Sequence, residues 1–198
     1  AKHAMANGGA NANGSSCECC SGCSTSGAGA GEITFRTYSA EEDLLALMSL
    51  VDKELSEPYS IFTYRYFVYN WPQLCFLAFE RVGTEEHCVG ALVCKADLHK
   101  QVLRGYVAML VVERRLRKRG IGKEMVKMAI ERMIAEGCAE VVLEAEVSNK
   151  AALNLYSKLG FIRDKRLYKY YLTGTDAYRL KLSISNAHLS LAHRDGIA

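Results

Sequence analysis

Hydrophobic and polar residues alternate with two periods along the chain, and each period predicts one type of element. The period of two over residues 33–37 predicts a first strand. Apolar residues at helical spacing then predict a helix that Pro58 stops. Ser39 and Glu42 have the spacing of a capping box, so we expect Ser39 to be the N-cap of this helix. The aromatic segment 62–69 predicts a second, shorter helix.

The middle of the chain carries apolar, β-branched runs that are typical of buried strands. Residues 74–80, 88–96 and 106–112 predict three strands, and their close spacing favours an antiparallel meander. A helical period follows Gly122, and Gly137 has the position of a C-terminal cap.

The C-terminal part continues the alternation of strands and helices. Residues 140–147 predict a strand, and either Ser148 or Asn149 caps the helix that follows. Residues 161–171 and 177–184 predict two more strands. The element order β-α-α-β-β-β-α-β-α-β-β predicts an α/β (α+β) domain. We expect a mixed, mostly antiparallel sheet of about seven strands flanked by about four helices.

Composition divides the chain into three parts. Residues 1–31 are mostly Ala, Gly, Asn and Ser, and such a segment buries too little apolar surface to offset its ordering entropy. We therefore expect a disordered, low-complexity tail there. Residues 32–184 carry the periodic pattern and predict one domain with a sizeable core. Residues 185–198 lose the pattern, which predicts a flexible C-terminal tail.

Charge and cysteine usage narrow the class of protein. The net charge of +3 is too small to indicate binding to nucleic acid or to a membrane surface. We expect no signal peptide and no membrane span, because no apolar run approaches the roughly 20 residues that a span needs. Four of the eight cysteines lie at 17–23 in one cluster without the paired spacing of a zinc site, so no metal is expected. The other four lie in or beside apolar segments, which favours a reduced, cytoplasmic protein.

A basic loop with two glycines joins the strand 106–112 to the helix after it. The run from Arg114 to Arg119 is followed by Gly120-Ile121-Gly122. Backbone N–H groups and the positive end of a helix dipole converge at such a loop, and glycine leaves no Cβ in front of them. The spacing fits neither a Walker loop nor a dinucleotide-binding fingerprint. By itself the pattern is compatible with a phosphate site and with an ordinary basic turn.

Two carboxylates, Glu144 and Glu146, lie on one face of the strand 140–147, opposite its apolar face. Carboxylates in the middle of a sheet are costly unless they face water or a functional site, so both interpretations stay open. Tyr156 lies two turns into the next helix and could equally be an ordinary amphipathic tyrosine. The cysteines have no evident His partner, so we do not expect a cysteine nucleophile or a covalent acyl-enzyme.

Together these features resemble the GNAT acetyltransferase superfamily. Arg117 precedes Gly120 by three residues and completes the Arg/Gln-x-x-Gly-x-Gly/Ala pattern of its acetyl-CoA pyrophosphate loop. The resemblance covers about residues 32–184 and is most specific at 55–60, 117–122, 143–156 and 166–172. Those four segments resemble the amino-terminal acetyltransferases of the NatC type.

The resemblance implies an enzyme, an acetyl-CoA-dependent peptide α-N-acetyltransferase that acts by direct attack of an amine on the thioester. Acetyl-CoA is its cosubstrate and no metal takes part. The substrate would be the N-terminal peptide of nascent proteins, with a preference for Met followed by a large hydrophobic residue. Auxiliary NatC-type subunits and the ribosome are the implied partners.

The resemblance also assigns roles to residues. It implies that Glu144 manages the proton of the substrate amine and that Tyr156 protonates the departing thiolate. The implied cofactor-binding residues are Leu110, Val111, Val112, Arg117, Lys118, Arg119, Gly120, Ile121, Gly122, Lys123, Asn149, Ala152 and Tyr156. The implied substrate-binding residues are Leu55, Glu57, Pro58, Tyr59, Tyr106, Tyr168, Tyr170 and Tyr171.

Two alternatives remain at this point. The first is the same scaffold acetylating lysine side chains or small amines, which would not need tyrosines on both sides of a peptide slot. The second is a catalytically silent, CoA-binding interaction subunit, against which Glu144 and Tyr156 both speak.

Overall fold

A computed structural model describes residues 31–55 and 59–184. The expected tails at 1–30 and 185–198 lie outside the described residues, and so do Glu57 and Pro58. Within the described part the strands are β1 Glu32–Thr37, β2 Cys75–Val82, β3 Glu85–His99, β4 Val102–Val112, β5 Glu140–Glu146, β6 Ile162–Leu167 and β7 Ala177–Ser183. The α-helices are α1 Glu41–Glu54, α2 Ile61–Asn70, α3 Ile121–Ala135 and α4 Lys150–Lys158.

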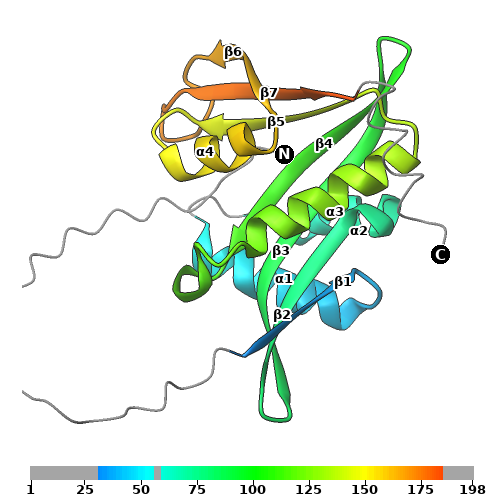
Figure 1. Cartoon of the computed structure of the whole chain (residues 1–198), viewed down its shortest axis with the longest axis vertical. Helices are drawn as coiled ribbons and strands as arrows, with labels where there is room; N and C mark the ends of the chain where they lie inside the picture. The colour runs from blue at the N-terminus through cyan, green and yellow to red at the C-terminus, as the bar shows by residue number, and fades with distance from the viewer. Residues whose placement is uncertain (1–30, 56–58, 185–198) are drawn as a thin grey trace, which may run out of the picture.

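The strands form one sheet in the order β1-β2-β3-β4-β5-β7-β6 (Figure 1). Neighbouring strands are antiparallel except β4 and β5, which are parallel. The parallel pair follows from the crossover through α3, which returns the chain to the same edge in the same direction. The predicted fold class, a mixed and mostly antiparallel sheet with flanking helices, is confirmed.

Two apolar clusters hold the helices against opposite faces of the sheet. On one face, α3 and α4 pack on β2 to β5 and β7 through side chains that include Met125, Met133 and Tyr156. On the other face, α1 and α2 pack on β2 to β4 through side chains that include Leu44 and Phe67. Each strand of the meander therefore has apolar side chains on both faces, which is why its sequence is apolar without interruption.

Strand boundaries differ from the sequence prediction in two places, and the structure decides between the two predicted caps of α4. The β3–β4 hairpin is longer than predicted, because its outer part carries exposed side chains such as Leu98 and has no apolar run to reveal it. Strand β6 ends at Leu167, well before residue 171, and a turn follows. Asn149, and not Ser148, caps α4 by accepting a hydrogen bond from the Ala152 N–H at 3.0 Å.

The predicted capping box at the start of α1 is wrong by one residue. Ala40 is the N-cap, and Asp43 occupies the third helical position that was assigned to Glu42. Asp43 accepts hydrogen bonds from the Ser39 N–H at 2.9 Å and from the Ser39 hydroxyl at 3.1 Å. Asp43 is 3% exposed and also pairs with Arg36 of β1 at 2.6 Å, so the shift ties the helix to the sheet.

Membrane-spanning helices and metal clusters are both absent from the described residues. None of the helices there is long and apolar enough to cross a membrane. The same residues contain no group of three His, Cys, Asp or Glu side chains that could hold a metal ion. The cysteine cluster at 17–23 lies outside them.

Asp43→Asn should lower the free energy of unfolding by about 1–2 kcal/mol, since Asn loses charge-assisted hydrogen bonds at a helix start. Burial acts to raise the pKa of Asp43, but the hydrogen bonds from Arg36 and Ser39 lower it by more. The stabilisation is therefore present above the unfolded-state pKa of about 3.9 and is lost as the pH falls through the lower folded-state value. Urea unfolding at pH 7 and in acid measures both effects.

Glu42→Gln is the matched control, because Glu42 is exposed beside Asp43 in the same first turn. It should change the free energy of unfolding by less than about 0.5 kcal/mol. An equal loss in the two variants would show that helix-end charge, and not the Asp43 hydrogen bonds, stabilises this junction.

Candidate active site

The site is organised around the place where β4 and β5 separate. Their pairing runs only from Arg104 opposite Glu140 to Tyr106 opposite Val142. Beyond Tyr106, β5 turns away with β7, and in the described chain no β4–β5 pair follows (Figure 1). The second half of β4, which contains the predicted cofactor-binding residues Leu110–Val112, therefore faces β5 without forming a ladder with it.

The loop after β4 ends in an N-terminus of α3 that suits an anion. Gly120 is the N-cap with φ of 87°, and no side chain caps the helix. A Cβ placed on Gly120 would have no atom within 4 Å, so the space in front of the helix is open. The first N–H groups of α3 have no partner inside the helix, and the helix dipole is positive there. These features fit a phosphate group and the predicted pyrophosphate loop.

Gly122 differs from Gly120, although both belong to the predicted signature. A Cβ on Gly122 would make only ordinary contacts, the nearest at 3.5 Å from Val112. The fold itself therefore has room for a small side chain at Gly122. In contrast, the positive φ at Gly120 strains any other residue, and Lys118 already has a positive φ of 66° in the same loop.

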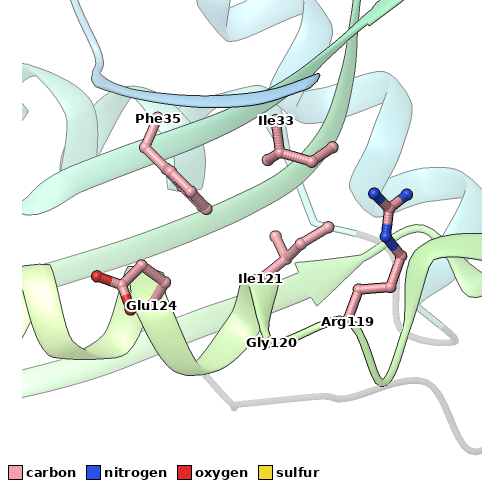
Figure 2. Close-up of a pocket in the computed structure, with 6 residues that line it drawn as sticks. All are labelled: Ile33, Phe35, Arg119, Gly120, Ile121 and Glu124. Carbon is pink, nitrogen blue, oxygen red and sulfur yellow. The ribbon is translucent and has the colours of Figure 1, made fainter. Parts of the chain in front are cut away.

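A groove of about 290 Å³ lies on the β1 side of this helix N-terminus. Its lining residues are Ile33, Phe35, Arg119, Gly120, Ile121 and Glu124 (Figure 2). Figure 2 shows the two β1 side chains opposite Ile121, with Arg119 and Glu124 towards the two ends. Neither Glu144 nor Tyr156 contributes to it. The groove adjoins the anion loop but is separate from the candidate catalytic residues.

Glu144 is 2% exposed, so the interpretation as a solvated outer face does not hold. Its Oε1 atom accepts hydrogen bonds from Arg179 Nε at 2.8 Å and pairs with Arg179 Nη2 at 2.7 Å. Its Oε2 atom accepts from the Tyr106 hydroxyl at 2.9 Å and from the Tyr170 hydroxyl at 3.4 Å. A buried carboxylate is stable only with such partners. Burial first, and the Glu144 charge second, raise the pKa of Tyr170 to about 12.

Arg179 was not predicted as a site residue. It lies directly opposite Glu144 in the antiparallel register of β5 and β7. The sequence does show charged residues alternating with apolar ones along β7. Which side chains these charged residues meet depends on the strand that pairs with β7. Only the pairing of β7 between β5 and β6 brings Arg179 to Glu144.

Tyr156 is fully buried on the α3/α4 face of the sheet, where its ring lies 5.4 Å from that of Phe161. Burial raises the pKa of Tyr156 well above its ordinary value, so the hydroxyl keeps its proton at neutral pH. Asn149 and Ala152, on the same helix, are buried and bonded to each other. The surface-tyrosine interpretation therefore does not hold for Tyr156.

Glu144 and Tyr156 lie on opposite faces of the sheet. The β5 residues on either side of Glu144, Leu143 and Ala145, belong to the α3/α4 cluster, so Glu144 points to the α1/α2 face. Tyr106 packs against the α1/α2 cluster and reaches Glu144 there. The two candidate catalytic side chains therefore lie on opposite faces of a sheet whose described part has no β4–β5 pair beyond Tyr106.

The predicted tyrosine walls come together in part. The Tyr170 and Tyr171 rings are 5.3 Å apart, and Tyr59 is near enough to contribute to the raised pKa of Tyr171, which burial chiefly causes. Tyr59 also packs on Tyr64 at 6.0 Å. Tyr168 is 76% exposed and lies under the guanidinium of a neighbouring arginine, away from this cluster.

Leu55 is buried at the end of α1, next to the α1–α2 loop, and packs in the α1/α2 cluster. The predicted substrate residues Glu57 and Pro58 lie outside the described residues.

The described cysteines are unsuited to nucleophilic attack. Burial raises the pKa of the Cys88 thiol to about 11 and that of Cys75 to about 12. Cys138 has a pKa of about 11 for the same reason, and that of Cys94 is well above its ordinary value. Thiols with such values stay protonated at neutral pH, whereas the thiolate is the nucleophile. This agrees with the expected direct transfer.

Comparison with known proteins gives a consistent result. The sequence profile of the acetyltransferase (GNAT) family matches residues 44–161. "N-alpha-acetyltransferase MAK3" of Arabidopsis thaliana is 63% identical over 152 residues, which are 77% of this chain and 78% of that protein. "N-alpha-acetyltransferase 30" of Homo sapiens is 58% identical over 151 residues, which are 76% of this chain but only 41% of the human protein.

A solved structure is also similar along nearly its whole length. "Crystal structure of the NatC complex bound to Gag peptide and CoA" contains a chain that is 46% identical, with a TM-score of 0.75. The match covers 78% of this chain and 99% of that one. With the anion loop, the diverging strands and the family profile in agreement, the chain belongs to the GNAT family as an acetyl-CoA-dependent N-alpha-acetyltransferase of the NatC catalytic-subunit type.

Proposed function

We propose that this chain acetylates the α-amino group of protein N-termini that begin with Met and a large hydrophobic residue. The observation that carries the proposal is the buried Glu144, held by Tyr106 and Arg179 on the face opposite Tyr156. The tyrosine cluster around Glu144 supports a substrate that is held as a chain end. The similarity to proteins named N-alpha-acetyltransferase 30 supports the same substrate class.

The chain's residues divide the chemistry between the two faces. Acetyl-CoA supplies the acetyl group as a thioester, and the N–H groups at the start of α3, around Ile121 to Lys123, would hold its pyrophosphate. The amine nitrogen attacks the thioester carbon, the new C–N bond forms and the C–S bond breaks. Glu144 receives the proton that the amine loses, at Oε2, because the partners of Oε2 are neutral tyrosine hydroxyls whereas Oε1 is paired with the Arg179 cation. Tyr156 keeps its proton at neutral pH and donates it to the departing sulfur.

General acid–base catalysis by Glu144 and Tyr156 suits an α-amino group as the substrate. An α-amino group has a reference pKa of about 7.7–8.0, so only modest assistance is needed to deprotonate it near neutral pH. A lysine side chain, with a reference pKa of about 10.4, would need much more. This difference favours N-termini over lysine side chains.

Assembly and location are part of the proposal. One solved relative is described as the NatC complex, which supports auxiliary subunits for this chain as well. Ribosome association and a cytoplasmic location remain predictions from the sequence.

Gly122→Val should lower the affinity for acetyl-CoA at least tenfold, because its methyl groups would stand where the phosphate approaches the N–H groups. Gly122→Ala is the matched control and should bind nearly as the parent does, because its Cβ meets nothing closer than 3.5 Å. Isothermal titration calorimetry with acetyl-CoA checks both variants, and circular dichroism confirms that they are folded. If the parent and a folded Gly122→Val variant bind acetyl-CoA with equal affinity, the loop is not part of the acetyl-CoA site.

Glu144→Gln should lower kcat by roughly 10²–10⁴, the usual contribution of a positioned acid or base. Tyr156→Phe should also lower kcat, with less change in KM, because only the hydroxyl is removed from a buried ring. Glu146→Gln is the control on the same strand face and should keep the parent rate. Steady-state kinetics with a Met-Leu peptide measure all three. Parent-like turnover in the first two variants would exclude the proposed acid–base roles.

A peptide panel tests substrate choice. Met-Leu should be acetylated best and Met-Glu less well. Ser-Glu and an internal-lysine peptide with a blocked N-terminus should react least. Each matched methylene in an apolar pocket contributes about 1–3 kcal/mol, so the preference should be graded. Transfer from labelled acetyl-CoA provides the measurement, and preference for Ser-Glu or for the blocked peptide would contradict the proposed specificity.

A further inference from the structure

Three cations of the anion loop pair with carboxylates of the protein. Arg115 pairs with Glu80 at 2.5 Å, and Arg119 lies 3.8 Å from the same carboxylate. Arg117, the first residue of the family signature, pairs with Glu54 at 2.5 Å. Two carboxylates of the fold therefore pair with three of the five cations that the sequence places at this loop. The pair between Glu54 and Arg117 is the one that joins the loop to α1.

Glu54 is the last residue of α1, and its side chain is only 6% exposed. Its Oε2 atom pairs with Arg117, and its Oε1 atom accepts a hydrogen bond from the Arg114 N–H at 3.3 Å. A carboxylate that is this deeply buried is stable only when a partner compensates its charge. The need to compensate the buried Glu54 charge therefore fixes the contact between α1 and the loop.

Arg117 connects a third element. Its Nε atom donates to the backbone carbonyl of Val112, the last residue of β4, at 2.9 Å, while its Nη2 atom is bound to Glu54. The guanidinium therefore links three segments: the end of β4, the loop that contains Arg117, and the end of α1. Two of its three nitrogens serve the protein's own acceptors, so the main donors for an anion are the backbone N–H groups beyond Gly120.

The end of α1 lies directly before the proposed peptide site. Leu55 follows Glu54, is buried, and donates its N–H to Val51. Tyr59 follows beyond residues 56–58, which lie outside the described residues, and it is near enough to Tyr171 to add to the raised pKa of Tyr171, which burial chiefly causes. A displacement of Glu54 would move the start of this loop, and a displacement of Arg117 would move the anion loop.

We infer that Glu54 and Arg117 are positioning residues that couple acetyl-CoA binding to peptide binding through the contact between α1 and the anion loop. The coupling works because one buried ion pair fixes the loop before α3 and the end of α1 in a single arrangement. The inference deepens the proposed function and rests on it for the peptide substrate. It also assigns Arg117 a role through Glu54 and not a direct contact with the pyrophosphate.

Glu54→Gln tests the inference, because it removes the charge and keeps the shape. Calorimetry should show that its Kd for acetyl-CoA rises about tenfold, within the range of typical coupling effects, and its KM for a Met-Leu peptide should rise as well. Lys53→Gln is the matched control. It breaks an exposed ion pair to Glu113 at the same junction, where Lys53 is 64% exposed, and should change either constant less than twofold.

The double variant separates the coupling from a direct phosphate contact. Arg117→Ala alone leaves Glu54 buried without its partner, so adding Glu54→Gln should recover part of the acetyl-CoA affinity. If Arg117 bound the phosphate directly, Glu54→Gln alone would leave the affinity unchanged or increase it, and the inference would be overturned. A lower melting temperature with normal Kd and KM would show a purely structural pair, which also overturns it.

Failure of the proposed function would look different. A parent protein that does not bind acetyl-CoA in the first titration would refute that function, whereas a parent that binds while Glu54→Gln behaves like Lys53→Gln would refute only the coupling.

Discussion

The arrangement of the site depends on one constraint, the short parallel contact between β4 and β5. Three residue pairs join these strands, and beyond them β5 follows its antiparallel partner β7. Because a parallel connection needs a crossover, α3 must begin near the end of β4, which places its N-terminus at the wide end of the separation. The position of the anion loop and the divergence of β4 and β5 therefore both follow from this short parallel pairing.

Burial of charge is the second principle that shapes this molecule. Asp43, Glu54, Glu80 and Glu144 are all nearly inaccessible, and each has an arginine from another segment as its partner. Burying such ions is costly, and a pair rarely stabilises a fold more than apolar residues of equal size would. Their benefit is geometric, since a guanidinium donates hydrogen bonds to a carboxylate in few orientations. At Glu144 this fixes one oxygen with Arg179 and leaves the other to the tyrosines.

The sequence predicted what depends on local periodicity and missed what depends on pairing. The meander, the four helices and the glycine loop followed from apolar spacing and turn residues. The capping box failed by one position because Asp43 and Glu42 are equally plausible locally, and only Arg36 of β1 decides between them. Arg179 was not predicted for the same reason, since only the register of β5 and β7 places it opposite Glu144. The full burial of Glu144 and Tyr156 likewise needed both faces of the sheet to be known.

The sheet separates the anion loop and Tyr156 on one face from Glu144 and its tyrosines on the other. This partition has an evolutionary consequence. Away from the Glu54–Arg117 pair, residues that select the acceptor can be exchanged with little effect on those that bind the donor, because the sheet lies between them. One scaffold can then acquire new acceptor preferences by drift on a single surface while its donor machinery stays constant.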